Sequence, residues 1–204
     1  MNRKANPISN WFRSSLDMLN IVNLEEIQSM LLRVPSLIRE LEGRDASFVG
    51  SVKAWLTQGE QILLNNRLVA AADVAVLRGV LISAERGVIP EGMAFSTRTT
   101  MRKIKDASAA EVLRKAEERI SNVISADVAR FAEGEKLTRQ IVAVARRKGL
   151  ILPNPGVDKR AEMLKATWQA MAVDVDLGAV TTHLVGLVGA HDVLILLDRM
   201  LPTS

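Results

Sequence analysis

Apolar residues recur three and four positions apart along most of this 204-residue chain, and this spacing predicts helices. We therefore expect an all-α fold, a multi-helix bundle of about seven helices built as a single helical domain over residues 1–204. The expected helices begin near residues 7, 24, 47, 68, 107, 158 and 177. Pro35 interrupts the second pattern, so we expect a kink or break near Val34.

The longest uninterrupted pattern predicts a central helix over 107–149. Ser108 and Glu111 have the spacing of a capping box at its start, and Gly149 follows three cations at its end. A straight helix of this length would measure about 60 Å, more than the diameter of about 43 Å expected for a compact domain of this size. The helix must therefore either project beyond the body of the domain or bend, and we favour a bend at Gly134, where helix propensity is lowest.

The segment from Leu68 to Glu85 is apolar on nearly all sides. A helix with no polar face is usually buried, and we expect this one to lie inside the bundle. The segment from Leu177 to Leu201 is also strongly apolar and long enough to span a membrane. Because Asp192 falls inside it, a buried bundle helix is favoured over a membrane span.

The first 22 residues contain a short amphipathic pattern. It is typical of a first bundle helix, and the alternative is an N-terminal arm over 1–22 that docks on a partner or a membrane surface. Asp17 and the short length weigh against the membrane. The candidate partner-binding residues share one helical face: Ile8, Trp11, Phe12, Leu16 and Leu19.

The composition indicates which residue types form the core and which cell compartment to expect. Hydrophobic residues make up 48% of the chain and aromatic residues only 3%, so the core must be aliphatic. The absence of cysteine excludes disulfides, thiolate metal sites and cysteine nucleophiles. No apolar run follows the first basic residues, which argues against a secretory signal, and we expect a cytoplasmic protein.

The net charge of +4 adds a mild preference for anionic partners. Residues 88–107 are expected to form a basic loop with no acid between Glu91 and Asp106. Together with the end of the central helix, this loop supplies the candidate phosphate-binding cations: Arg98, Arg102, Lys103, Lys105, Arg146, Arg147 and Lys148. A solvated loop and a helix end that matches the helix dipole explain the same residues, and we favour that interpretation.

Signatures of chemistry are missing from the sequence. His183 and His191 would lie about 12 Å apart on one helix, too far to share a metal ion. No Glu-x-x-His pair, phosphate-binding loop, dinucleotide fingerprint or serine elbow occurs. We therefore predict no catalytic residue, no metal and no cofactor, and we lean against an enzyme.

The sequence thus contains many apolar helical faces and no recognisable motif of a catalytic, metal or cofactor site. The sequence favours a non-catalytic interaction protein, acting as an adaptor, assembly subunit or regulator through protein contacts and associating with itself as a homo-oligomer. The alternative is a nucleic-acid-associated protein that uses the segment from Arg98 to Lys105. A membrane-associated protein is the third and least favoured class.

Overall fold

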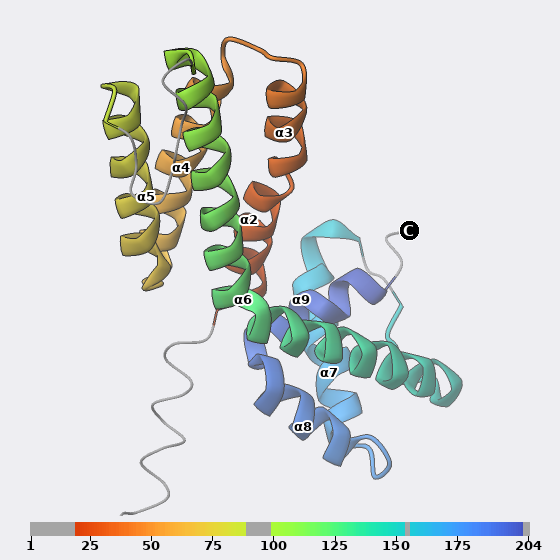
Figure 1. Cartoon of the computed structure of the whole chain (residues 1–204). Helices are drawn as coiled ribbons and strands as arrows, with labels where there is room; N and C mark the ends of the chain where they lie inside the picture. The colour runs from red at the N-terminus through yellow and green to blue at the C-terminus, as the bar shows by residue number, and fades with distance from the viewer. Residues whose placement is uncertain (1–18, 89–98, 154–155, 202–204) are drawn as a thin grey trace, which may run out of the picture. The chain divides into compact units, whose positions relative to one another are not determined.

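All regular structure in the described part of the chain is helical. The structure is a computed structural model, and it describes residues 19–88, 99–153 and 156–201. These residues form α-helices and one short 3-10 helix and contain no strand, so the all-α prediction is confirmed (Figure 1). The chain divides into two compact units: unit 2 is drawn from residues 22–125, and unit 1 combines residues up to 21 with residues from 126 onwards. The expectation of a single domain over 1–204 stays a prediction.

Unit 2 is built from four helices and the first half of a fifth. These are α2 (Ile21–Leu31), α3 (Val34–Glu42), α4 (Phe48–Asn65), α5 (Ala70–Glu85) and the start of α6 (Met101–Lys148). Trp55 of α4 is completely buried, and its indole N–H donates to the carbonyl oxygen of Met30 at 2.9 Å. This bond satisfies the one polar atom of the largest side chain in the core and fixes α4 against the end of α2.

The break expected near Val34 is present. One apolar pattern in the sequence becomes two helices, because α2 ends at Leu31 and α3 begins at Val34 with Pro35 in its first turn. Proline has no N–H, so residue 35 cannot donate to the carbonyl of Leu31 as the next turn of a continuous helix would require. The same residue is well tolerated at a helix start, where N–H groups have no partner inside the helix.

The central helix α6 is longer than expected at its beginning. It starts at Met101, so residues 101–107 are helical and not part of a loop. Ser108 therefore lies inside the helix and is buried, and the N–H of Lys103 is 3.4 Å from the hydroxyl of Thr100 at the actual start. The predicted end is confirmed: Gly149 has a φ of +68°, and the N–H of Leu150 donates to the carbonyl of Ala145 at 3.0 Å.

Gly134 does not break α6, which is helical on both sides of it. A Cβ atom placed on Gly134 would lie 2.6 Å from Cγ1 of Val188, a distance that real Cβ atoms do not show. The side chains of Leu184 and Leu196 lie next nearest. Glycine is needed here because α6 approaches its neighbours closely, and not because the helix ends.

Unit 1 packs the second half of α6 with α7 (Arg160–Val173), α8 (Gly178–Val188) and α9 (Ala190–Met200), after a 3-10 turn at Val157–Lys159. The single helix expected over 177–201 is two helices bent by 113°, because Gly189 takes a φ of +90° and a ψ of 150°. No single helix in the described residues is long and apolar enough to cross a membrane; α8 and α9 reach that length and composition only as a bent pair.

Arg130 ties several parts of unit 1 together. Its guanidinium donates to the carbonyl of Leu19 at 2.6 Å and to the carbonyl of Leu187 at 3.3 Å, and it pairs with Asp127 at 2.6 Å. It also lies 4.3 Å from the ring centre of Phe131. Only 12% of the Arg130 side chain is exposed, so these interactions operate away from bulk water and stabilise the unit strongly.

Candidate interaction surface

Helix α5 has an apolar face on each side, and the bundle covers one of them. The inner face packs on α4 and is buried at Ala70, Ala71, Val74, Leu81 and Ala84. These positions repeat at helical spacing, as expected for a bundle helix. The sequence predicted that the rest of the helix would be buried as well.

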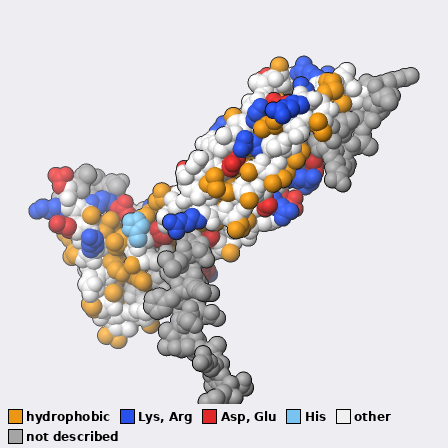
Figure 2. Space-filling model, turned by 90° about the vertical axis from the view of Figure 1, so that its left-hand side faces the viewer, with side chains coloured by type: hydrophobic (Ala, Val, Ile, Leu, Met, Phe, Trp, Pro, Cys, Tyr) orange, Lys and Arg blue, Asp and Glu red, His pale blue; other side chains and the backbone are white. Residues whose placement is uncertain are grey.

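That prediction is wrong for the outer face of α5. Val69 at its start is 84% exposed and Val76 in its middle is 66% exposed. We call the uncharged residues along this face the outer stripe: Val69, Ala72, Val76, Gly79, Val80 and Ser83. Gly79 has open space where a side chain would be. Figure 2, which faces this side of unit 2, shows hydrophobic atoms running between charged side chains.

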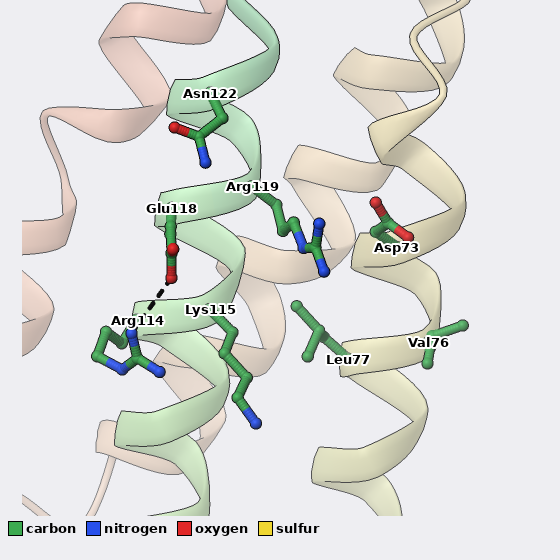
Figure 3. A pocket seen from close by; sticks show the side chains of 8 residues that line it. All are labelled: Asp73, Val76, Leu77, Arg114, Lys115, Glu118, Arg119 and Asn122. Carbon is green, nitrogen blue, oxygen red and sulfur yellow. Dashed lines mark hydrogen bonds and ion pairs between the residues drawn. The ribbon is translucent and has the colours of Figure 1, made fainter.

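Two of the three charged residues of α5 are held away from the outer stripe. Arg78 pairs with Glu60 of α4 at 2.8 Å, and Glu85 pairs with Lys53 of α4 at 2.7 Å. Both pairs satisfy charges within unit 2. Asp73 stands at the edge of the stripe, on the side that faces α6 (Figure 3).

A groove of about 430 Å³ runs between α5 and α6 beside the stripe. Val76 and Leu77 supply its apolar side from α5, and Asp73 lies at one end of that side (Figure 3). The side from α6 is polar and mostly cationic, with Arg114, Lys115, Glu118, Arg119 and Asn122. The groove therefore joins an apolar strip to a charged one, as the core and rim of a protein interface do.

Ion pairs along α6 order the charged side of this groove. Arg114 contacts Glu111 at 2.9 Å and Glu118 at 3.2 Å, and Lys115 lies 3.3 Å from Glu111. The hydrogen bonds from Arg114 lower the pKa of Glu111 to about 2. These pairs give the exposed side of α6 an ordered row of charges, and the Arg119 side chain extends from α6 across the groove towards α5 (Figure 3).

The predicted phosphate-binding residues do not form one cluster within either unit. Arg98 lies outside the described residues. In unit 2, the guanidinium of Arg102 donates to the carbonyl of Arg44 and lies 3.7 Å from Asp106, while Lys103 is exposed and Lys105 half-buried.

The other predicted cations end α6 in unit 1. Arg146 donates to the carbonyl of Met200 at 3.1 Å, and Arg147 is exposed. The ammonium of Lys148 lies 2.7 Å from Asp174 and also pairs with Asp176, and hydrogen bonds to these two carboxylates raise the pKa of Lys148. Cations that already hold protein acceptors have less to gain from a phosphate, and nucleic-acid binding stays a prediction.

Of the predicted partner-binding residues, Ile8, Trp11, Phe12 and Leu16 lie outside the described residues. Leu19 is described, and it is 5% exposed. Its carbonyl also accepts the hydrogen bond from Arg130. Leu19 is therefore part of the core of unit 1 and offers little surface to a partner.

In the apolar segment 177–201, the histidines lie at the surface and an aspartate lies in the core. His183 and His191 are both exposed, whereas Asp192 is 5% exposed and one of its carboxylate oxygens has no hydrogen-bond partner. Burial raises the pKa of Asp192, against the lowering effects of the Ile21 N–H, His191 and Arg130. In the described residues, no three histidine or acidic side chains are grouped to hold a metal ion.

Comparisons with family models, with curated proteins and with solved structures found no match to this chain. The surface that the geometry singles out, on α5, was not among the surfaces suggested by the sequence. The sequence does show that residues 68–85 are apolar on all sides, which is compatible with an exposed apolar face, but the same pattern fits a fully buried helix equally well. Only the positions of the neighbouring helices show which of its faces is uncovered.

Proposed function

We propose that this chain is a non-catalytic helical interaction protein, an adaptor, assembly subunit or regulator that associates with a second copy of itself through the outer stripe of α5. The observation that carries the proposal is an uncharged apolar face on a helix whose opposite face already packs in the bundle. Exposed apolar surface that is contiguous and rimmed by charge is typical of protein contact sites.

A second copy fits the stripe better than a charged partner does. In a two-fold dimer the same patch lies on both sides of the interface, so it must not repel itself. The stripe contains no charge, and the ion pairs of Arg78 and Glu85 are directed to α4. Self-pairing therefore removes apolar surface from water without bringing together unpaired like charges along the stripe.

The size of the stripe sets the expected strength. With three valines, an alanine, a glycine and a serine, the stripe is smaller than the ~800 Å² per partner of a standard interface. We expect a weak, reversible dimer, with a dissociation constant on the order of micromolar or weaker, as for small and transient contacts.

Sedimentation equilibrium over a range of concentrations tests this proposal. The wild-type protein should approach twice its mass of 22.3 kDa as concentration rises. Val76→Asp should weaken association at least about tenfold, because each copy would bury an unpaired carboxylate. Since Val76 is 66% exposed, the variant should keep the wild-type circular dichroism spectrum.

Val175→Asp is the matched control. It makes the same change at a valine that is 96% exposed in the turn between α7 and α8 of unit 1, away from α5 in the sequence. Association should be unchanged in this variant. A wild-type protein that stays at the monomer mass up to about 1 mM, where contacts weaker than about 4 kcal/mol are lost, would overturn the proposal.

A further inference from the structure

The order of residues along the outer stripe carries information about how two copies would meet. Val76 lies at its centre, with Ala72 and Val69 before it and with Gly79, Val80 and Ser83 after it. Resting on the proposed self-association, we infer that two α5 helices pair antiparallel across a two-fold axis at Val76. In this register Val76 faces its own copy, Ala72 faces Val80, and Val69 faces Ser83.

Packing favours this register. Small residues stand about one turn on either side of Val76, and both Ala72 and Gly79 are exposed. Antiparallel pairing sets the small Ala72 against the larger Val80 at both ends of the contact, so that large and small side chains interdigitate. Parallel pairing would instead set Val80 against Val80 and Ala72 against Ala72, which leaves one level crowded and the other open.

Charge favours the same arrangement. An antiparallel two-fold places α6 of both copies on the same side of the helix pair, so that the two grooves face one another. Asp73 of one copy then lies opposite Gly79 of the other. In Figure 3 the Lys115 side chain runs away from Asp73 and ends beyond Leu77, towards that half of α5. The Asp73 carboxylate of each copy would therefore approach the Lys115 ammonium of the other. Lys115 also lies 3.3 Å from Glu111 of its own copy, but that pair is exposed and weak, so the ammonium can be shared with a second carboxylate.

The two Asp73 carboxylates stay apart in this register. The two Asp73 residues are displaced by about 9 Å along the helix axis, since each lies three residues from Val76 at about 1.5 Å per residue. A parallel pair would put α6 and its counterpart on opposite sides, where the groove residues of one copy do not meet those of the other. In a parallel pair, the interface would therefore be limited to the stripe and would exclude the groove residues.

Single-cysteine crosslinking tests the inference directly, because the natural chain contains no cysteine. Three variants are oxidised separately and then as mixtures: Val76→Cys, Ala72→Cys and Val80→Cys. The antiparallel register predicts a disulfide dimer of Val76→Cys alone and a mixed dimer of Ala72→Cys with Val80→Cys. Ala72→Cys alone should stay uncrosslinked, because its two copies would lie about 12 Å apart along the axis, beyond the reach of a disulfide.

Val175→Cys is the control for random collision, since it is a highly exposed position outside α5, and it should give no dimer at the same concentration and time. Efficient dimers of Ala72→Cys alone and of Val80→Cys alone would show a parallel pair and overturn the inference. So would an absence of crosslinks in all three variants when the wild-type protein dimerises, which would place the contact elsewhere and leave the proposed function standing. A wild-type protein that does not dimerise would overturn both.

Discussion

Gly134→Ala distinguishes a glycine required by packing from one that merely weakens a helix. In an open helix interior the change to alanine stabilises by about 1 kcal/mol, because alanine has the higher helix propensity. At Gly134 the added Cβ would lie 2.6 Å from Cγ1 of Val188, which is only 3% exposed. Valine is β-branched and has one preferred rotamer in a helix, so it cannot turn aside without strain.

The two effects have opposite signs, and packing should win. Overfilling a packed core costs about 1–3 kcal/mol, and more at a contact this short than at an ordinary one. Because this contact is unusually short, we take the upper end of that cost, about 3 kcal/mol, and subtract the gain of about 1 kcal/mol in propensity. Gly134→Ala should then lower the free energy of unfolding by about 2 kcal/mol. A helix whose glycine marked only a weak point would become more stable instead.

Urea unfolding followed by circular dichroism at 25 °C measures the change. Gly186→Ala is the matched control in the same unit, because Gly186 is exposed on α8 with nothing within 4 Å of a new Cβ, and it should stabilise slightly. Adding Val188→Ala to Gly134→Ala should cost less than the sum of the single changes, by more than about 1 kcal/mol, because the clash is removed. If Gly134→Ala is as stable as the wild type, the packing argument is wrong.

Three other changes test the fold and the nucleic-acid alternative. Arg130→Met should lower the free energy of unfolding by about 2–4 kcal/mol in urea titrations, because it leaves a carboxylate and two carbonyls without their donor. Burial raises the pKa of Asp192 above 3.8. The protonated Asp192 carboxyl therefore contributes its full stabilisation below that pH, and this stabilisation is lost as pH rises through the pKa of the folded state. Asp192→Asn should therefore melt at a higher temperature than the wild type at pH 7, and the two should converge near pH 3 in calorimetry. In mobility shifts at about 50 mM salt we expect no binding of mixed DNA or RNA, because several of the cations hold protein acceptors. Salt-sensitive binding that is lost on changing Arg102, Lys103 and Lys105 to alanine would instead support the alternative.

Local sequence determined the all-α class and some of the helix ends. Helical spacing of apolar residues gave the all-α class, and the break before α3 follows from the missing N–H of Pro35 alone. Gly149 ends α6 because a left-handed residue there lets the last carbonyls find donors. Each of these features depends on residues within one or two turns, so it can be read without knowing what packs against the helix.

The same local rules misplaced the start of α6. Ser108 and Glu111 have capping-box spacing, but Ser108 is buried in the helix, and Glu111 pairs with Arg114 and Lys115. A serine three residues before a glutamate fits a helix interior as well as a helix start once neighbouring helices cover the serine. The sequence contains no information on that cover, since it comes from residues far away in the chain.

Only the tertiary structure decided which apolar faces are covered. Periodicity shows that α5 is apolar on both sides, but the positions of α4 and α6 leave Val76 in solvent. Likewise, the closeness of α8 to α6 turns Gly134 from a weak point into a packing requirement, and burial in unit 1 isolates an oxygen of Asp192. Propensity and capping act between neighbours in sequence, whereas burial is set by contacts between distant segments, and the candidate site of this protein depends on burial.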